Sequence, residues 1–257
     1  MGHFYSREGV PHFDVTPKKA QEMGLYYSVT EIQKLEHNEG ISQWKINTAI
    51  QCCANNGQED GESFDDYKRR IKRDMYGDSS STQLGTDIHN AIERVLSRGV
   101  DLGDIEDRLI PYVTPAVNYF LGQEFELISV EKIVTNQKEG YAGTADMIAQ
   151  SKNKQDFILD WKTTGNIPSK PYPGQVEQVS AYAVAEFGED RVLNEEIWGA
   201  NAYIHQKEFY KIGERKGQAK FRVHSYNPET LARAYRGFLK VLDLWRFRTG
   251  YDPRQHN

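Results

Sequence analysis

The spacing of apolar residues divides the chain into a helical first part and a mixed second part. Over residues 41–54 the apolar positions recur at helical intervals. Ser63-Phe64-Asp65-Asp66 forms a capping box that predicts the start of another helix, which runs to about Tyr76. Residues 1–80 are therefore expected to form a helical, loop-rich region.

Beyond residue 80 two further helices are predicted before the periodicity changes from helical to alternating. A helix with one apolar stripe is predicted over about 82–98, and another follows over 111–122. Three strand-like runs come next, separated by tight polar turns: 125–135, 141–149 and 157–162. The pattern ends with a helix over about 174–187, strands near 196–205 and 221–226, and a last helix from Pro228.

This order of elements predicts an α/β fold with a mixed central sheet flanked by helices. Residues 81–257 are expected to form the core and residues 1–80 a helical N-terminal cap. A chain of 257 residues, 38% apolar and 27% charged, is typical of a folded, soluble protein. No apolar run approaches the roughly 20 residues that a membrane-spanning helix needs.

Charge and cysteine content limit the function classes. A formal net charge of -5 excludes a protein that binds polyanions over its whole surface, so nucleic-acid contact would require a local basic patch. The only cysteines, Cys52 and Cys53, are adjacent. Two thiols alone do not supply a four-ligand zinc or iron–sulfur site. The expected state is a reduced intracellular chain.

The strongest candidate chemistry lies on two of the predicted strands. Asp146 ends the segment Gly143-Thr144-Ala145-Asp146, and Asp160-Trp161-Lys162 closes the next strand. Neighbouring strands lie about 4.8 Å apart, so the two carboxylates can come close enough to require a cation between them, and Mg²⁺ or Mn²⁺ suits such oxygen ligands. Alternation places Lys162 on the same face as Asp160, where its ammonium could orient the attacking water and offset charge on a phosphate.

Three further sites carry both a functional and an ordinary interpretation. His89 borders the apolar stripe of its helix, where it is either a metal ligand or a partly buried histidine. Gln178 and Tyr182 share one helix face, which either contacts DNA or is simply solvated. The densest basic run either tracks phosphates or forms a solvated helix surface: Lys68, Arg69, Arg70, Lys72 and Arg73.

Together these residues resemble the RecB-type branch of the PD-(D/E)xK nucleases. The motifs that carry the resemblance occur in the same order and at similar spacing: Gly85-x-x-x-His89, Glu131, Gly143-Thr-Ala-Asp146, Asp160-Trp-Lys162-Thr-Thr164 and Gln178-x-x-x-Tyr182. Residues 26–32 and Trp44 also resemble phage exonucleases that are similar to the mitochondrial genome maintenance exonuclease.

The resemblance implies a restriction-endonuclease-like core and an Mg²⁺- or Mn²⁺-dependent DNA exonuclease that prefers single strands. It implies that Asp146, Asp160 and Lys162 are catalytic, and that the metal ligands are His89, Asp146, Asp160 and the main-chain carbonyl of Trp161. Glu131 would support the site or bind a second ion.

The resemblance also carries expectations about cofactors and partners. Neither an iron–sulfur cluster nor a nucleotide is expected, because the chain lacks the cysteines for the cluster and the phosphate-binding loop of a helicase motor. Unwinding would then require a partner, such as a helicase, a recombinase or a single-strand-binding protein. The expected location is the cytoplasm of a bacterial or phage-infected cell, and the sequence leaves DNA repair, recombination, nucleotide scavenging and maturation of phage DNA all open as pathways.

Two other functions remain open from the sequence. A structure-specific endonuclease would use the same catalytic residues on the same fold. A non-catalytic DNA-binding module would be expected to have lost a metal ligand or the lysine, and here all are present. A serine or cysteine α/β hydrolase is disfavoured because the sequence has no nucleophile elbow.

Overall fold

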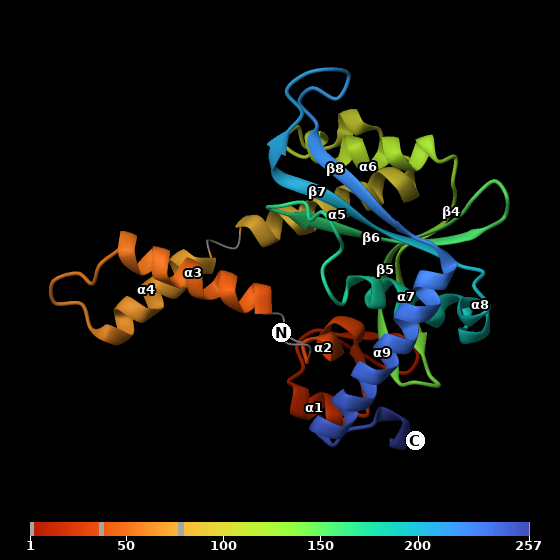
Figure 1. Ribbon diagram of the computed structural model, residues 1–257, viewed down its shortest axis with the longest axis horizontal. Helices are drawn as coiled ribbons and strands as arrows, with labels where there is room; N and C mark the ends of the chain where they lie inside the picture. The colour runs from red at the N-terminus through yellow and green to blue at the C-terminus, as the bar shows by residue number, and fades with distance from the viewer. Residues whose placement is uncertain (1–2, 36–38, 77–79, 257) are drawn as a thin grey trace. The chain divides into compact units, whose positions relative to one another are not determined.

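The computed structural model describes residues 3–35, 39–76 and 80–256 (Figure 1). The chain forms two compact units, one made of Met1–Glu36 with Ile88–Asn257 and the other of His37–Asp87. The smaller unit holds α3 (Glu39–Asn55), α4 (Phe64–Tyr76) and the first residues of α5 (Ser80–Arg98).

The larger unit is built on a mixed sheet of eight strands within the described residues. The strands are β1 (Phe4–Tyr5), β2 (Pro11–His12), β3 (Tyr26–Ser28), β4 (Glu126–Asn136), β5 (Tyr141–Gln150), β6 (Asp156–Thr164), β7 (Trp198–Phe209) and β8 (Ala219–Tyr226). Their order is β2-β1-β3-β5-β6-β7-β8, and β4 pairs with β5. β3 with β5 and β6 with β7 are parallel, and the other pairs are antiparallel.

Helices flank this sheet, so the fold is α/β as predicted. The remaining helices are α1 (Pro17–Glu22), α2 (Val29–Gln33), α6 (Ile110–Gly122), α7 (Gln175–Phe187), α8 (Glu189–Leu193) and α9 (Pro228–Thr249), with 3₁₀ turns at Leu102–Asp104 and Pro253–Gln255. α7 and α9 cover one face of the sheet, and α6 lies on the other (Figure 1). No helix in the described parts of the chain is long and apolar enough to span a membrane.

The main core lies under α9 and α7. The predicted stripe on α9 is buried in full: Leu231, Tyr235, Phe238, Leu242 and Trp245. At about 1.5–3 kcal/mol for each fully buried large side chain, this stripe fixes α9 against α7 and the adjoining sheet. The helix begins where Asn227 accepts a hydrogen bond from the Thr230 amide (2.9 Å), and it ends at Gly250 in a left-handed conformation.

The first 36 residues differ from the predicted division of the chain. They were expected in a helical cap over 1–80, but β1 and β3 belong to the sheet and the segment joins the larger unit. Strands of two and three residues are too short to produce an alternating pattern, so the sequence gives no signal for them.

Candidate metal centre

The candidate centre forms where the sheet divides. β4 pairs along the whole of β5, while the other edge of β5 pairs with β3 at Tyr141–Ala142 and with β6 at Met147–Gln150. Residues 143–146 lie between these two pairings. Met147 is opposite Leu159, so the next positions in register are Asp146 and Asp160, at the point where β5 and β6 separate. This geometry brings the two predicted carboxylates to one place.

Asp146 bridges the two diverging strands. Its Oδ2 accepts a hydrogen bond from the Trp161 amide at 2.7 Å. This bond takes the place of the backbone hydrogen bond that the ladder between β5 and β6 would form next if it continued. In an extended strand the N–H and C=O of one residue point to the same side. The main-chain carbonyl of Trp161 therefore points towards the side occupied by Asp146, which suits its predicted role as a ligand.

Glu131 enters the same site through an unusual backbone conformation. It lies on β4 opposite Asp146, between the pairs Lys132–Ala145 and Val130–Met147, and its φ is 47°. A positive φ is uncommon for a non-glycine residue in a strand, and such irregularities redirect a side chain out of the regular alternation.

His89 on α5 completes a three-residue group. The ligand atoms of His89, Glu131 and Asp146 lie within 4.8 Å of one another. The His89 Nδ1 atom is 3.7 Å from Asp146 Oδ2. An imidazole nitrogen with two carboxylates is a donor set that suits Mn²⁺ and is compatible with Mg²⁺. Asp160 and the Trp161 carbonyl are not members of this group, and their ligand roles stay predictions.

The protonation states reflect the crowding of acids. Burial raises the pKa of Asp146 well above its ordinary value, and the charges of Asp160 and Glu131 raise it further. Burial, with the nearby Glu93 and Asp160, raises the pKa of Glu131 to about 7. Burial lowers the pKa of His89, which favours the neutral imidazole that binds metals. A divalent cation would relieve the repulsion between these carboxylates.

Lys162 lies beside this group on the face predicted for it. Its Nζ atom is 2.7 Å from Asp160 Oδ2 and donates to Gln178 Oε1 at 3.1 Å. Asp160 Oδ2 also accepts from Asn201 Nδ2 at 2.7 Å, and Asn201 Oδ1 accepts from the Tyr226 hydroxyl at 2.6 Å. A continuous buried network therefore fixes the carboxylate and the ammonium relative to each other.

Gln178 and Tyr182 lie inside the protein rather than on a surface. They are 7% and 4% exposed, and Gln178 Nε2 donates to the Tyr182 hydroxyl at 2.9 Å. Tyr182 packs against Gly143, where an added Cβ would be 2.3 Å from its ring. Gln178 thus holds Lys162 and Tyr182 holds Gln178, and the buried ring of Tyr182 is not presented to a base for stacking.

The basic run on α4 lies in the smaller unit and is largely paired with local acids. Lys68 contacts Asp65 at 2.8 Å, and Arg69 pairs with Asp66. Arg70 binds both carboxylate oxygens of Glu62 and donates to the Gly57 carbonyl, which fastens the preceding loop to the helix. Arg73 has Asp74 within 3.9 Å, and Lys72 has no ion pair among the described residues. Contact with DNA by this run stays a prediction.

Several residues of the site carried no sequence signal. Asn201 and Tyr226 come from β7 and β8, far along the chain from Asp160, and neither belongs to a motif. Tyr5 of β1 shares a hydrogen bond of 3.1 Å with Thr144 beside the fork. Of these residues only Glu93 could have been found from the sequence, because it lies one helical turn after His89 on the same face of the helix.

Comparisons with known proteins do not assign a family. No protein-family model matches the chain, and the search of curated proteins gives no match. Among solved structures the chain is similar to the one described as "Crystal structure of SSO0001", with 14% identity and a TM-score of 0.28 over 61% of this chain and 74% of that one. A likeness of this size carries no argument about function.

Proposed function

We propose that the protein is a metal-dependent deoxyribonuclease with a restriction-endonuclease-like core, acting as an exonuclease on DNA ends and preferring single strands. The observation that carries the proposal is the convergence of His89, Glu131 and Asp146 at the fork of the sheet. The ion pair of Lys162 with Asp160, at 2.7 Å, lies beside them. The resemblance of the motifs to PD-(D/E)xK nucleases supports DNA as the substrate.

The residues present fit Mg²⁺ or Mn²⁺. His89, Glu131 and Asp146 would hold the ion, and Asp160 is near enough to raise the pKa of both carboxyls. Such an ion would act as a Lewis acid on the scissile phosphate and lower the pKa of a bound water.

The other residues position the substrate and neutralise charge. The Lys162 ammonium, held between Asp160 and Gln178, supplies a fixed positive charge where negative charge grows on the phosphate. Asn201 holds Asp160 from its other side and keeps that carboxylate from turning away. The Trp161 amide does the same for Asp146.

The test is digestion of single-stranded oligonucleotides labelled at either end, in Mg²⁺, Mn²⁺ or chelator. We expect a metal-dependent ladder whose surviving label gives the polarity of digestion. A covalently closed single-stranded circle distinguishes the activities, because an exonuclease leaves it intact and an endonuclease opens it.

Lys162→Ala should lower the rate by at least about 100-fold, the usual cost of removing a fixed donor from a developing negative charge. The matched control is Lys152→Ala, an exposed lysine of the β5–β6 turn that pairs with Glu124 at 2.5 Å. Equal, undiminished digestion by both variants would refute the assignment.

A further inference from the structure

The β7–β8 hairpin concentrates positive charge in an acidic protein. Residues 205–224 contain six lysines and arginines against two glutamates, a net charge of +4, while the whole chain carries -5. The cationic residues are Lys207, Lys211, Arg215, Lys216, Lys220 and Arg222. The turn that joins β7 and β8, in blue at the top of Figure 1, extends beyond the paired part of the sheet.

Most of this charge is open to solvent and available to an external anion. Residues 211–217 are all exposed. Lys220 pairs with Glu208 at 2.5 Å, whereas Lys207, Lys211 and Lys216 form no ion pair with any residue that the structure describes. The basic run on α4 is different, because most of its cations are paired with acids of the same unit.

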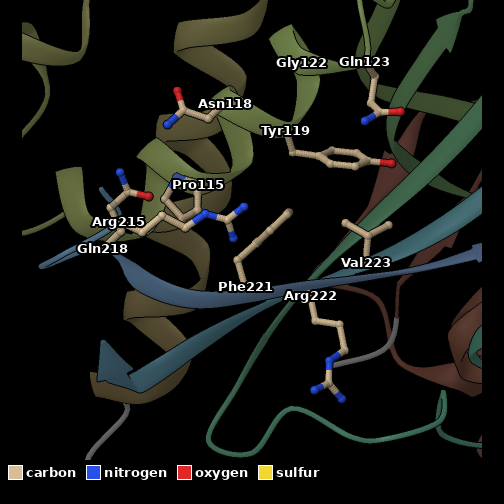
Figure 2. Close-up of a pocket in the computed structure, with 10 residues that line it drawn as sticks. All are labelled: Pro115, Asn118, Tyr119, Gly122, Gln123, Arg215, Gln218, Phe221, Arg222 and Val223. Carbon is tan, nitrogen blue, oxygen red and sulfur yellow. The ribbon is translucent and has the colours of Figure 1, made fainter. Parts of the chain in front are cut away.

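A hollow of about 400 Å³ lies at the base of the hairpin, between β8 and α6 (Figure 2). Arg215, Gln218 and Phe221 line it from the hairpin side, and Asn118 and Tyr119 line it from α6. It therefore combines aromatic faces, amide groups and two arginines, Arg215 and Arg222. The Arg215 guanidinium also lies 5.6 Å from the centre of the Tyr210 ring.

The hairpin is continuous with the candidate metal centre. Lys162 on β6 is in register with Tyr203 on β7 and with Arg222 on β8. β6 and β7 are parallel, so β7 runs on past the level of Lys162 into the basic segment. Lys207 is four residues beyond Tyr203, roughly 13 Å along the strand. The exposed lysines of the hairpin therefore lie beyond Lys162 along the strand direction, whereas the hollow faces α6, on the opposite side of the sheet from Lys162 and α7.

We propose that the β7–β8 hairpin and the adjoining hollow form a second binding surface, which takes single-stranded DNA. The lysines and Arg215 would contact phosphates, and the hollow would receive a base. Single-stranded nucleic acid fits better than a duplex or an acidic protein, because only unpaired bases can enter an aromatic and amide-lined hollow while their phosphates meet the cations. That this strand is a substrate rests on the proposed function.

The experiment measures binding of a fluorescent oligothymidylate to the full chain in EDTA, by anisotropy, over a range of salt concentrations. Lys211→Ser with Lys216→Ser removes two exposed charges from the hairpin. The control, Lys152→Ser with Lys154→Ser, removes the same charge from the β5–β6 turn at the other end of β6. If each hairpin lysine contacts one phosphate, binding should weaken roughly 25-fold at about 0.1 M salt, and the slope of log K against log salt should fall by about 1.4.

The control should bind as the unmodified protein does. Equal binding by the two double variants, or no binding of the oligothymidylate by the unmodified protein, would overturn the proposal. An abasic strand of equal length should bind more weakly than oligothymidylate, and equal affinity would overturn the base contact. EDTA prevents metal-dependent cutting, so the result is independent of whether the chain is a nuclease.

Discussion

Replacing Glu131 with glutamine should stabilise the protein without metal and weaken its response to metal. The pKa of Glu131 is raised from 4.5 to about 7 by burial and by the charges of Glu93 and Asp160. A glutamine of nearly the same shape removes the charge and keeps the backbone, with its φ of 47°, under the same strain.

The sign of the expected stability change follows from the direction in which the pKa of Glu131 is shifted. The carboxyl holds its proton more tightly in the folded chain than in the unfolded chain, so its contribution to stability is complete below about pH 4.5 and is lost as the pH rises through about 7. At about 1.36 kcal/mol per pH unit this amounts to roughly 3 kcal/mol. Because the residue is only partly buried, solvent screening reduces the effect to about 1–2 kcal/mol.

The assay is thermal unfolding of both proteins in EDTA at about pH 4.5 and pH 8, and again at pH 8 with Mn²⁺. Without metal, Glu131→Gln should unfold about 3–6 °C higher than the unmodified protein at pH 8 and at about the same temperature at pH 4.5. With Mn²⁺ the difference should shrink or reverse, because an ion at 100 times its Kd adds about 2.7 kcal/mol only to a chain that binds it.

Glu126→Gln is the matched control. Glu126 lies on the same strand, is exposed and pairs with Lys154 at 3.0 Å, so its loss should change stability by less than about 1 kcal/mol at either pH. The proposed role of Glu131 is refuted if Glu131→Gln is no more stable than the unmodified protein at pH 8 in EDTA, or if Mn²⁺ stabilises both proteins equally.

Three other substitutions test how the residues of the site are held in place. Gly143→Ala would place a Cβ 2.3 Å from the Tyr182 ring and should lower the free energy of unfolding by roughly 1–3 kcal/mol; a urea titration that shows no loss would contradict this contact. Asn201→Leu leaves Asp160 and the Tyr226 hydroxyl each without one partner, so it should cost about 1–3 kcal/mol and also lower the rate of digestion. Tyr226→Phe removes only the outer bond and should have the smaller effect on both measurements, so an equal effect would argue against the network.

The sequence predicted the parts of the fold that have long, regular patterns. The three strands that became β4, β5 and β6 and the helices α7 and α9 lie within a few residues of their predicted bounds. Asp160 and Lys162 share one face as the alternation of the strand required, because both lie in regular β structure.

What could not be predicted depends on contacts between distant segments. No sequence pattern indicates the positive φ of Glu131. In the structure, the residue with this backbone conformation has its carboxylate beside that of Asp146. The burial of Tyr182 depends on the space left by Gly143, 39 positions earlier. The charge of the β7–β8 hairpin was readable from the sequence, but only the structure connects it in register to Lys162.

The most direct test of the central claim is anomalous diffraction from crystals of the protein grown or soaked with Mn²⁺. We expect one strong manganese peak bounded by the His89 imidazole and the carboxylates of Glu131 and Asp146, and we expect this peak to be lost in Asp146→Asn. Crystals that contain Mn²⁺ elsewhere but none at these three residues would contradict the account.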